Sequence, residues 1–461
     1  PRVSFTNVWV PESALLGPRF STAAAIRQAH GGGEGLRDAV LPDAVAFAHA
    51  TEEVAAIMRV CAGAGVPVIP FGTGTSLEGH LQALRGGLSL DLSGMDRILA
   101  VNAADMDCRV EAGVTREALN AHLRDMGLFF PPDPGANASI GGMAATRASG
   151  TNAVRYGTMR ELVLGLEVVL ADGRIIRTGG RARKSSAGYD LTRLFVGSEG
   201  TLGIITQVQL RLAAIPEAVR AATVQFPTLD GAVACVMDVM QAGIAMARIE
   251  LLDALQMEAC IRWSRLEALA PLPSLFLEFH GSDAGVAEQV AAVAAIAAAH
   301  GGQGWAFAES AEARSRLWKA RHDAYHAARA LAPGKDSLTT DACVPISRLA
   351  DCINACRADA EALQLVAPIV GHVGDGNFHM LVLCDPADPD ERARAEALCA
   401  RVAVHALACG GTITGEHGIG VHKLAAMRAE HDEGALAVMR AIKAALDPAG
   451  LLNPGKTVPA A

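Results

Sequence analysis

Val68-Ile69-Pro70-Phe71-Gly72-Thr73-Gly74-Thr75-Ser76-Leu77-Glu78-Gly79-His80 is a short apolar run that leads into a loop of glycine and hydroxyl residues. Successive glycines let backbone N–H groups point into a shared concavity, and such concavities bind phosphate oxygens. The loop does not fit the nicotinamide-binding fingerprint G-x-G-x-x-G, because Leu77 stands where the third glycine is needed. This stretch therefore predicts a phosphate-binding loop outside the nicotinamide-binding folds.

Two further loops of small residues follow in the same half of the chain. One covers residues 131–142 and leads on to Ser149 and Gly150, and the other covers residues 197–205. Three such loops suit a long ligand whose pyrophosphate lies against bare backbone. Three unrelated turns are the alternative explanation.

The composition is typical of a globular chain with two or three domains. The chain has 461 residues, of which 51% are hydrophobic and 19% are charged. Its net charge of −9 and the lack of a Lys/Arg cluster exclude nucleic acid as an expected partner. Ten cysteines contain no C-x-x-C pair, which argues against an iron–sulfur cluster or structural zinc within this chain. No targeting segment is visible, so we expect a cytoplasmic protein, with peripheral attachment to an inner membrane and a removed leader left open.

The residue pattern of the sequence changes near Pro216. Before it, short β-branched runs predict strands at residues 66–71, 88–92, 109–111, 162–170 and 204–212. Helices are predicted there at residues 51–64 and 115–126. After it, Ala-rich helices alternate with strands predicted at residues 221–226, 275–280 and 380–384. We expect an α+β fold with domains 1–215 and 216–430, and a C-terminal segment, 431–461, that returns to the first domain.

A second stretch carries the candidate chemistry: Gly371-His372-Val373-Gly374-Asp375-Gly376-Asn377-Phe378-His379. Asp375-Gly376 favours a two-residue type I′ turn, and apolar strand-forming residues follow it. Such a turn places His372 opposite His379, with Cβ atoms about 4.5–5.5 Å apart. Two imidazoles this close, with Glu416-His417 further along the chain, indicate a divalent metal site beside a base. Unrelated polar residues on loops are the alternative.

Arg321 shares a predicted helix face with two aromatic residues. Trp318, Arg321 and Tyr325 follow the spacing i, i+3, i+7. From the residues alone, Arg321 is either a side chain that packs its stem under solvent or a clamp for an anionic substrate.

Taken in order, the three loops and the motifs G-H-x-G-D-G-N-x-H, G-E-H-G-I-G and L-N-P-G-K resemble the FAD-linked D-2-hydroxyacid dehydrogenases of the vanillyl-alcohol oxidase superfamily. The chain is most similar to the D-lactate dehydrogenase (cytochrome) branch, and the resemblance covers residues 42–456. It implies a two-part FAD-binding domain of the vanillyl-alcohol oxidase/PCMH type, an α+β substrate (cap) domain, and a C-terminal segment that packs on the FAD domain.

The resemblance also implies roles for individual residues. FAD is expected to be held non-covalently, with His80 as the candidate if a covalent tether exists. The implied FAD-binding residues lie in the three loops, in the segment that follows the second loop and in the returning C-terminus: Pro70, Gly72, Thr73, Gly74, Thr75, Ser76, Gly79, His80, Pro132, Asp133, Gly135, Ser139, Gly142, Thr146, Ser149, Gly150, Tyr156, Glu199, Gly200, Gly203, Ile204, Ile205 and Asn453. His372, His379 and Glu416 are implied as ligands of zinc or manganese, and His417 and Arg321 as the catalytic base and the arginine of the substrate pocket.

The implied reaction is the oxidation of D-lactate, or of a related small D-2-hydroxy acid, to the 2-keto acid, with hydride transfer to flavin N5. Relatives that act on D-2-hydroxyglutarate have a lysine where Thr339 stands and an asparagine where Leu381 stands, so this chain is expected to prefer a small or apolar-tailed substrate. The expected electron acceptor is a cytochrome, a quinone or an electron-transfer flavoprotein, and a homodimer is left open. The alternatives are a glycolate oxidase flavoprotein subunit, a D-2-hydroxyglutarate dehydrogenase and a non-catalytic flavin electron relay.

Overall fold

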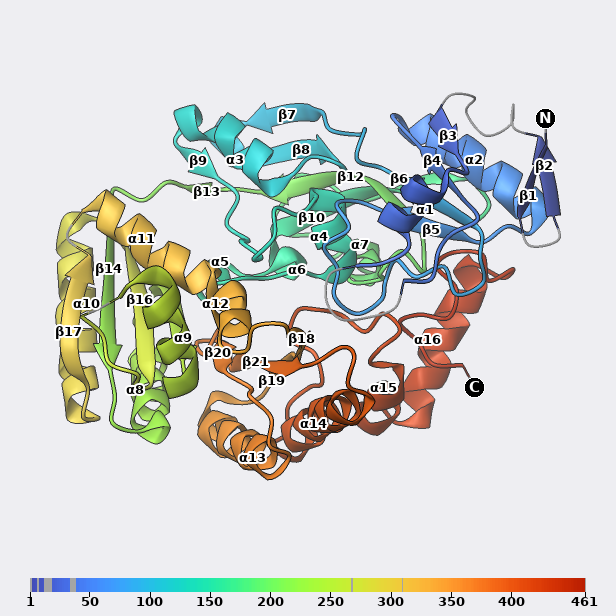
Figure 1. Ribbon diagram of the computed structural model, residues 1–461. Helices are drawn as coiled ribbons and strands as arrows, with labels where there is room; N and C mark the ends of the chain where they lie inside the picture. Colours follow the sequence, from blue (N-terminus) through green and yellow to red (C-terminus); the bar gives the residue numbers. More distant parts are fainter. Residues whose placement is uncertain are drawn as a thin grey trace. The chain divides into compact units, whose positions relative to one another are not determined.

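The computed structural model describes residues 2–5, 8–11, 19–33, 39–266, 268–308 and 310–460. The chain divides into two compact units, which are drawn with their helices and strands labelled in Figure 1. Unit 1 contains residues 1–149, 157–215 and 416–461, and unit 2 contains residues 150–156 and 216–415. The domain bounds predicted from the sequence, 1–215, 216–430 and 431–461, stay a prediction.

Unit 1 is built on two main sheets. The antiparallel five-stranded sheet has the order β11-β10-β12-β8-β7. Its strands are β7 (Ile98–Asn102), β8 (Asp107–Glu111), β10 (Val163–Val169), β11 (Ile175–Gly179) and β12 (Ile204–Arg211). In the four-stranded sheet, β3-β4-β6-β5, the last three strands pair in parallel. Its strands are β3 (Phe20–Ser21), β4 (Ala44–Phe47), β5 (Val68–Phe71) and β6 (Leu88–Asp91).

Short strand pairs and helices complete unit 1. The pairs are β1 (Arg2–Phe5) with β2 (Val8–Pro11), and β9 (Leu128–Phe129) with β13 (Ala213–Ala214). The helices are α1 (Ala24–His30), α2 (Thr51–Ala64), α3 (Arg116–Leu123), α4 (Ile140–Thr146), α6 (Met159–Leu162), α7 (Leu191–Phe195), α15 (Leu424–Glu430) and α16 (Glu433–Leu446).

Helix α2 shows how the sequence builds this unit. Glu52 and Glu53 lie in its first turn, where negative charge is favourable, and Gly65 ends it with a φ of +66°. Its buried face, which includes Ile57 and Met58, packs in one core with the parallel strands. Burying a side chain of this size contributes about 1.5–3 kcal/mol.

The C-terminal segment joins the same sheet. Leu452 forms a parallel bridge with Val68, because Val68 donates to the carbonyl of Leu451 at 2.8 Å and Asn453 donates to the carbonyl of Val68 at 2.9 Å. This confirms the C-terminal return expected from the sequence. It also fixes Asn453 beside the strand that leads into the first glycine loop.

Unit 2 is built on one antiparallel eight-stranded sheet with the order β17-β14-β16-β15-β20-β21-β18, in which β19 pairs with β21. The strands are β14 (Ala218–Gln225), β15 (Met246–Leu252), β16 (Ser274–Gly281), β17 (Gln303–Ala308), β18 (Asp336–Thr339), β19 (Ala342–Cys343), β20 (Ile369–Gly371) and β21 (Asn377–Cys384). The helices are α5 (Ala153–Tyr156), α8 (Leu229–Gln241), α9 (Ala254–Ser264), α10 (Asp283–Ala299), α11 (Ala311–His322), α12 (Ala324–Ala330), α13 (Leu349–Ala362) and α14 (Pro389–Ala408).

One face of β15 and β16 is covered by α9, α11 and α12. Leu252 and Phe276 on these strands share an apolar cluster with Met257, Trp318 and Ala324 on the helices. Helix α10 packs against β14 and β16 (Figure 1). In the part of the chain that the structure describes, no helix has the length and apolarity needed to cross a membrane.

Candidate functional site

In unit 1, the three glycine-containing loops lie against one another. The backbone N–H of Ser139 in the second loop donates to Thr73 Oγ1 of the first at 3.3 Å. A Cβ atom on Gly72 would lie 2.4 Å from Ser139 Oγ, and one on Gly200 of the third loop would lie 2.9 Å from Pro70 Cγ. Only glycine allows these approaches, so the loops form a concavity lined by bare backbone.

Three serine hydroxyls in these loops suit a polar ligand. Ser76, Ser139 and Ser198 each bury the hydroxyl oxygen with no hydrogen-bond partner among the described residues. A buried hydroxyl left without a partner costs about 1–3 kcal/mol, so such groups normally meet a ligand or water. Backbone concavities and unsatisfied hydroxyls are the features that a pyrophosphate requires, and the residues present therefore fit FAD.

Glu199 ties the third loop to two segments from the C-terminal part of unit 1. Its carboxylate accepts hydrogen bonds from the backbone N–H of Ile419 at 2.7 Å and of Gly420 at 2.8 Å, and from Thr457 Oγ1 at 2.8 Å. His80 Nε2 lies 3.1 Å from the same carboxylate. Burial alone would raise the pKa of Glu199, but the His80 charge and the hydrogen bonds lower it, so the carboxylate stays ionised.

Asn453 and Lys456 complete this buried group. Asn453 Nδ2 donates to the backbone carbonyl of Glu199 at 2.7 Å, and Lys456 Nζ donates to Asn453 Oδ1. Burial lowers the pKa of Lys456 to about 7, although the charge of Glu199 opposes that shift. The L-N-P-G-K motif therefore joins the loop cluster through polar side chains as well as through the sheet.

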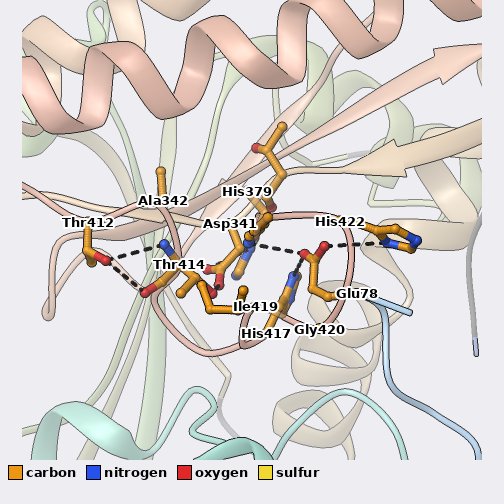
Figure 2. A network of polar contacts seen from close by, with 12 residues as sticks. Glu78, Asp341, Ala342, His379, Thr412, Thr414, His417, Ile419, Gly420 and His422 are labelled. Atoms are coloured by element: carbon orange, nitrogen blue, oxygen red, sulfur yellow. Dashed lines mark hydrogen bonds and ion pairs between the residues drawn. The ribbon is translucent and has the colours of Figure 1, made fainter. Parts of the chain in front are cut away.

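His417, the predicted base, is fixed within unit 1 beside the first loop. Its Nδ1 lies 3.8 Å from Glu78 Oε1, and Figure 2 shows Glu78 between His417 and His422. Lys423 Nζ lies 3.1 Å from Glu78 Oε1. Burial opposes the charge of Glu78, but Lys423, His422 and His417 together lower its pKa to about 2. An anionic Glu78 beside Nδ1 favours the tautomer with the proton on that nitrogen, which makes Nε2 the basic one.

In unit 2, the two predicted metal-binding histidines lie near each other, but the predicted two-residue turn and its strand register are wrong. The ring centroids of His372 and His379 are 5.5 Å apart. The partner of His379 across the β20–β21 pair is Val370, so His372 lies in a longer loop rather than opposite His379.

The loop is shaped by its neighbours instead of by an ideal turn. Of the two residues in the expected turn, only Gly376 has a positive φ, +78°, which excludes type I′. A Cβ on Gly376 would lie 2.0 Å from the carbonyl oxygen of Val344, and one on Gly374 would lie 2.6 Å from side-chain atoms of Ile249 and Val154. Tertiary packing therefore sets this loop.

Each histidine is oriented by an acceptor for its Nδ1–H group. His372 Nδ1 lies 2.8 Å from Glu250 Oε1, and His379 Nδ1 lies 3.1 Å from the carbonyl oxygen of Thr340. Asp341 Oδ1 lies 3.6 Å from the same nitrogen of His379. Histidines that bind metals usually donate the other ring N–H to a carboxylate or a carbonyl in this way. The two side chains therefore fit a divalent metal through Nε2.

Arg321 forms a buried ion pair with Glu250. Its Nε donates to Glu250 Oε2 at 2.9 Å, and its Nη2 lies 2.6 Å from the same oxygen. Burial disfavours the charged form of Glu250, but His372 and Arg321 lower its pKa. The sequence-based alternative of an arginine that only packs its stem under solvent is wrong, because only 9% of the Arg321 side chain is exposed.

Three other predicted site residues are distributed between the units. Glu416 belongs to unit 1, where Ser149 Oγ donates to its Oε2 at 2.5 Å. Its convergence with the two histidines stays a prediction. Gly150 and Tyr156, predicted to bind FAD, belong to unit 2, where the Tyr156 hydroxyl lies 2.8 Å from His280 Nδ1.

The residues that hold the predicted site residues in place were not predicted from the sequence. These are Glu78, Glu250 and Asp341, together with His280, which pairs with Glu278 at 2.8 Å. An available signal was a charged residue within an apolar segment, as at Glu250 in Met246-Ala247-Arg248-Ile249-Glu250-Leu251-Leu252. Such residues are almost never buried unless they are paired.

Comparison with known families covers most of the chain. Residues 42–179 match the model described as "FAD binding domain", and residues 215–457 match "FAD linked oxidases, C-terminal domain". A relative named probable D-lactate dehydrogenase, mitochondrial, from Danio rerio is 52% identical over 95% of this chain and 88% of its own length. D-lactate dehydrogenase [cytochrome], mitochondrial, from Arabidopsis thaliana is 45% identical over 91% of this chain and 74% of its own length.

Among solved structures, 4-ethylphenol oxidase from Gulosibacter chungangensis is similar with a TM-score of 0.82. The match covers 97% of this chain and 96% of that one, at 19% sequence identity. At this identity the likeness concerns the fold alone.

Proposed function

This chain belongs to the FAD-linked D-2-hydroxyacid dehydrogenase family, in the branch of the cytochrome-type D-lactate dehydrogenases, and on that premise we propose that it oxidises D-lactate to pyruvate with the help of a divalent metal. The fold is α+β, of the vanillyl-alcohol oxidase/PCMH type. The observation that carries the metal part of the proposal is the pair of histidine rings 5.5 Å apart, each with Nδ1 held by an oxygen.

The three loops of unit 1 are proposed to hold FAD. Backbone N–H groups of these loops bind the pyrophosphate, and the hydroxyls of Ser76 and Ser139 satisfy their hydrogen bonds on the cofactor. When bound, FAD supplies the acceptor for the hydride, which we place at flavin N5. The association of His80 with Glu199 supports a cofactor held without a covalent bond to His80, because that ring already has a buried ionic partner.

His372, His379 and Glu416 are proposed as the metal ligands. Two imidazoles and one carboxylate suit zinc or manganese and leave positions for a bidentate substrate. A divalent ion there acts as a Lewis acid on the substrate hydroxyl and carboxylate. Glu416 directly follows Gly415, the last residue of unit 2, and its carboxylate is held by Ser149, which supports a ligand role.

His417 is proposed as the base that takes the hydroxyl proton. Glu78 beside its Nδ1 favours the tautomer whose Nε2 accepts that proton, and its negative charge stabilises the imidazolium that results. Arg321 is proposed to bind the substrate carboxylate, since a guanidinium pairs with carboxylates in a fixed plane.

The residues beside His379 support a small substrate. Thr339 and Leu381 are direct partners across the β18–β21 pair, and Leu381 shares a strand face with His379 because side chains alternate along a strand. The two positions where dicarboxylate-using relatives have a lysine and an asparagine are therefore adjacent. Because Leu381 is apolar, it offers no partner to a second carboxylate on the substrate. This favours a substrate with a methyl group at that end.

The acceptor is proposed to be a one-electron carrier, because the Arabidopsis thaliana relative is named for a cytochrome. A quinone or an electron-transfer flavoprotein is the alternative. The cytoplasmic location and the homodimer stay predictions, and the two relatives described above are named mitochondrial.

The proposal is tested by following flavin absorbance in the purified protein under anaerobic conditions. We expect flavin bands, bleaching by D-lactate but not by L-lactate, and loss of bleaching after dialysis against a chelator with recovery on adding Mn²⁺ or Zn²⁺. A protein without flavin bands would contradict FAD binding, and undiminished bleaching in a metal-free sample would contradict the metal role.

The same assay separates the alternatives. Faster bleaching by glycolate indicates a glycolate oxidase subunit, and faster bleaching by D-2-hydroxyglutarate indicates that dehydrogenase. Flavin that no 2-hydroxy acid reduces indicates an electron relay. His372→Ala should lose both metal and bleaching, and bleaching without metal in this variant would make the ion merely structural.

A further inference from the structure

We propose that Glu250 is a positioning residue that links Arg321 to His372, so that one carboxylate orients both the substrate-binding arginine and a metal ligand. The inference rests on the proposed function, which gives Arg321 and His372 these roles. It adds a residue that the family motifs quoted from the sequence do not contain.

Glu250 divides its two oxygens between two partners. Oε2 accepts from Arg321 Nε at 2.9 Å and lies 2.6 Å from Nη2, whereas Oε1 lies 2.8 Å from His372 Nδ1. The Glu250 side chain is 1% exposed, so water does not compete for either oxygen. A buried charge persists only when it is paired and hydrogen-bonded, and here both conditions are met by the two side chains to be positioned.

The consequence for each partner follows from the atoms involved. Glu250 takes the Nε–Nη2 edge of the guanidinium, so an anionic ligand would meet the Nη1–Nη2 edge. A carboxylate at His372 Nδ1 fixes the tautomer with the proton on that nitrogen and orients Nε2 toward a metal. The orientations of Arg321 and His372 are coupled, because the Glu250 carboxylate can rotate only if its contacts with both side chains change.

Glu278 on the neighbouring strand is a matched control. It is also buried and holds a histidine and an arginine, since its Oε1 lies 2.8 Å from His280 Nε2 and 3.7 Å from Arg248 Nε. Arg248 is its cross-strand partner and lies two residues before Glu250, so the two glutamates share one face of the sheet. A general effect of removing a buried carboxylate from this face should appear equally in both variants.

The experiment compares Glu250→Gln, Glu278→Gln and Arg321→Gln in the FAD-loaded protein. The affinity for Mn²⁺, and for Zn²⁺ in a separate series, is measured by equilibrium dialysis, and KM for D-lactate is measured from steady-state turnover with an artificial electron acceptor. We expect Glu250→Gln to weaken metal binding about 10- to 100-fold and to raise KM. Arg321→Gln should raise KM and, through the shared carboxylate, weaken metal binding by less than Glu250→Gln does, whereas Glu278→Gln should leave the metal affinity within about threefold.

A purely structural role is separated by the double variant Glu250→Gln/Arg321→Gln. Because it removes both charges of the buried pair, it should fold and keep its flavin even if Glu250→Gln is unstable, and its metal affinity should remain lowered. Normal metal affinity in a folded Glu250 variant would overturn the proposed link between Arg321 and His372 without contradicting the proposed function. Absence of metal binding in the unaltered protein would overturn the proposed metal role and this link with it.

Discussion

Glu199 in unit 1 and Glu250 in unit 2 are both buried carboxylates, but they are held by different kinds of group. Glu199 accepts two backbone N–H groups and a hydroxyl, from segments that are distant in the sequence, and the His80 side chain lies 3.1 Å from it. Glu250 is held by the side chains of Arg321 and His372. A carboxylate bound to backbone joins loops into a cradle, whereas one bound to side chains sets the direction of reactive groups.

In a second pair of buried carboxylates, the one held by side chains lies in unit 1 and the one held by backbone N–H groups lies in unit 2. Glu78 in unit 1 is surrounded by Lys423, His417 and His422, and Asp253 in unit 2 accepts the backbone N–H groups of Gln256 and Ile369. The pKa of Glu78 is lowered to about 2, whereas burial raises the pKa of Asp253 to about 6 even though the N–H groups oppose it. A cationic side chain beside the carboxylate, rather than the unit, therefore decides the direction in which its pKa shifts.

The largest effect is expected from Glu199→Ala. This change leaves the N–H groups of Ile419 and Gly420 without their acceptor and removes the buried partner of His80. We expect a loss of about 3–5 kcal/mol in stability and protein purified largely without flavin. The measurements are the ratio of flavin to protein absorbance and the thermal midpoint. Glu117→Gln, at an exposed position of α3, is the control, and full flavin loading in Glu199→Ala would refute the role in the cradle.

A smaller and pH-dependent effect is expected from Glu78→Gln. Because the pKa of Glu78 is lowered from 4.5 to about 2, its charge contributes stability that is present above about pH 4.5 and is lost as the pH falls through about 2. We expect the variant to be about 2–3 kcal/mol less stable than the unaltered protein at pH 7. This difference in the free energy of unfolding should become smaller below pH 4.5. Urea unfolding between pH 7 and pH 3 measures this difference in stability, and a constant difference over that range would show that the charge is not the cause.

Asp253→Asn should act in the opposite direction. The folded-state pKa of Asp253, about 6, lies above the usual 3.8, so this carboxyl costs stability as the pH rises from 3.8 through 6. Asparagine keeps an oxygen for the N–H groups of Gln256 and Ile369 without that cost. We expect a gain of about 2 kcal/mol at pH 7 that disappears near pH 4. A loss at pH 7 would mean that the N–H groups stabilise the ionised form.

The smallest effect concerns the substrate. The double variant Thr339→Lys/Leu381→Asn introduces, at adjacent strand positions, the two polar side chains of the relatives that use D-2-hydroxyglutarate. We expect kcat/KM for D-2-hydroxyglutarate relative to D-lactate to rise about tenfold, which corresponds to about 1.4 kcal/mol. The two substrates are compared by steady-state turnover with an artificial electron acceptor, with each single variant as a control. An unchanged ratio would show that this strand face does not meet the substrate tail.

Some elements could be predicted because their signal is local. Helix α2 begins and ends where the sequence predicts, since its apolar spacing, acidic first turn and Gly65 lie within one short segment. Strand β15 was missed because Met, Ala, Arg, Glu and Leu are strong helix formers, and only the neighbouring strands make this segment extended. That omission is also the reason why Glu250 was not recognised.

The loop between β20 and β21 also could not be predicted from local sequence signals. The Asp-Gly turn rule predicts a register from two residues, but the close approach of Gly374 to Ile249 and Val154, and of Gly376 to Val344, selects another loop. A turn preference amounts to about 1 kcal/mol or less, and packing against three residues outweighs it.

The sequence by itself determined the glycine loops, the order of the motifs and hence the family, because backbone freedom and motif spacing are local properties of the chain. It also identified His372, His379, Glu416 and His417 as a candidate set. Only the tertiary structure decided which groups hold them, with Glu250 at His372 and Glu78 at His417. A buried charge takes its partner from whichever strands or loops enclose it, and that enclosure exists only after the sheets have formed.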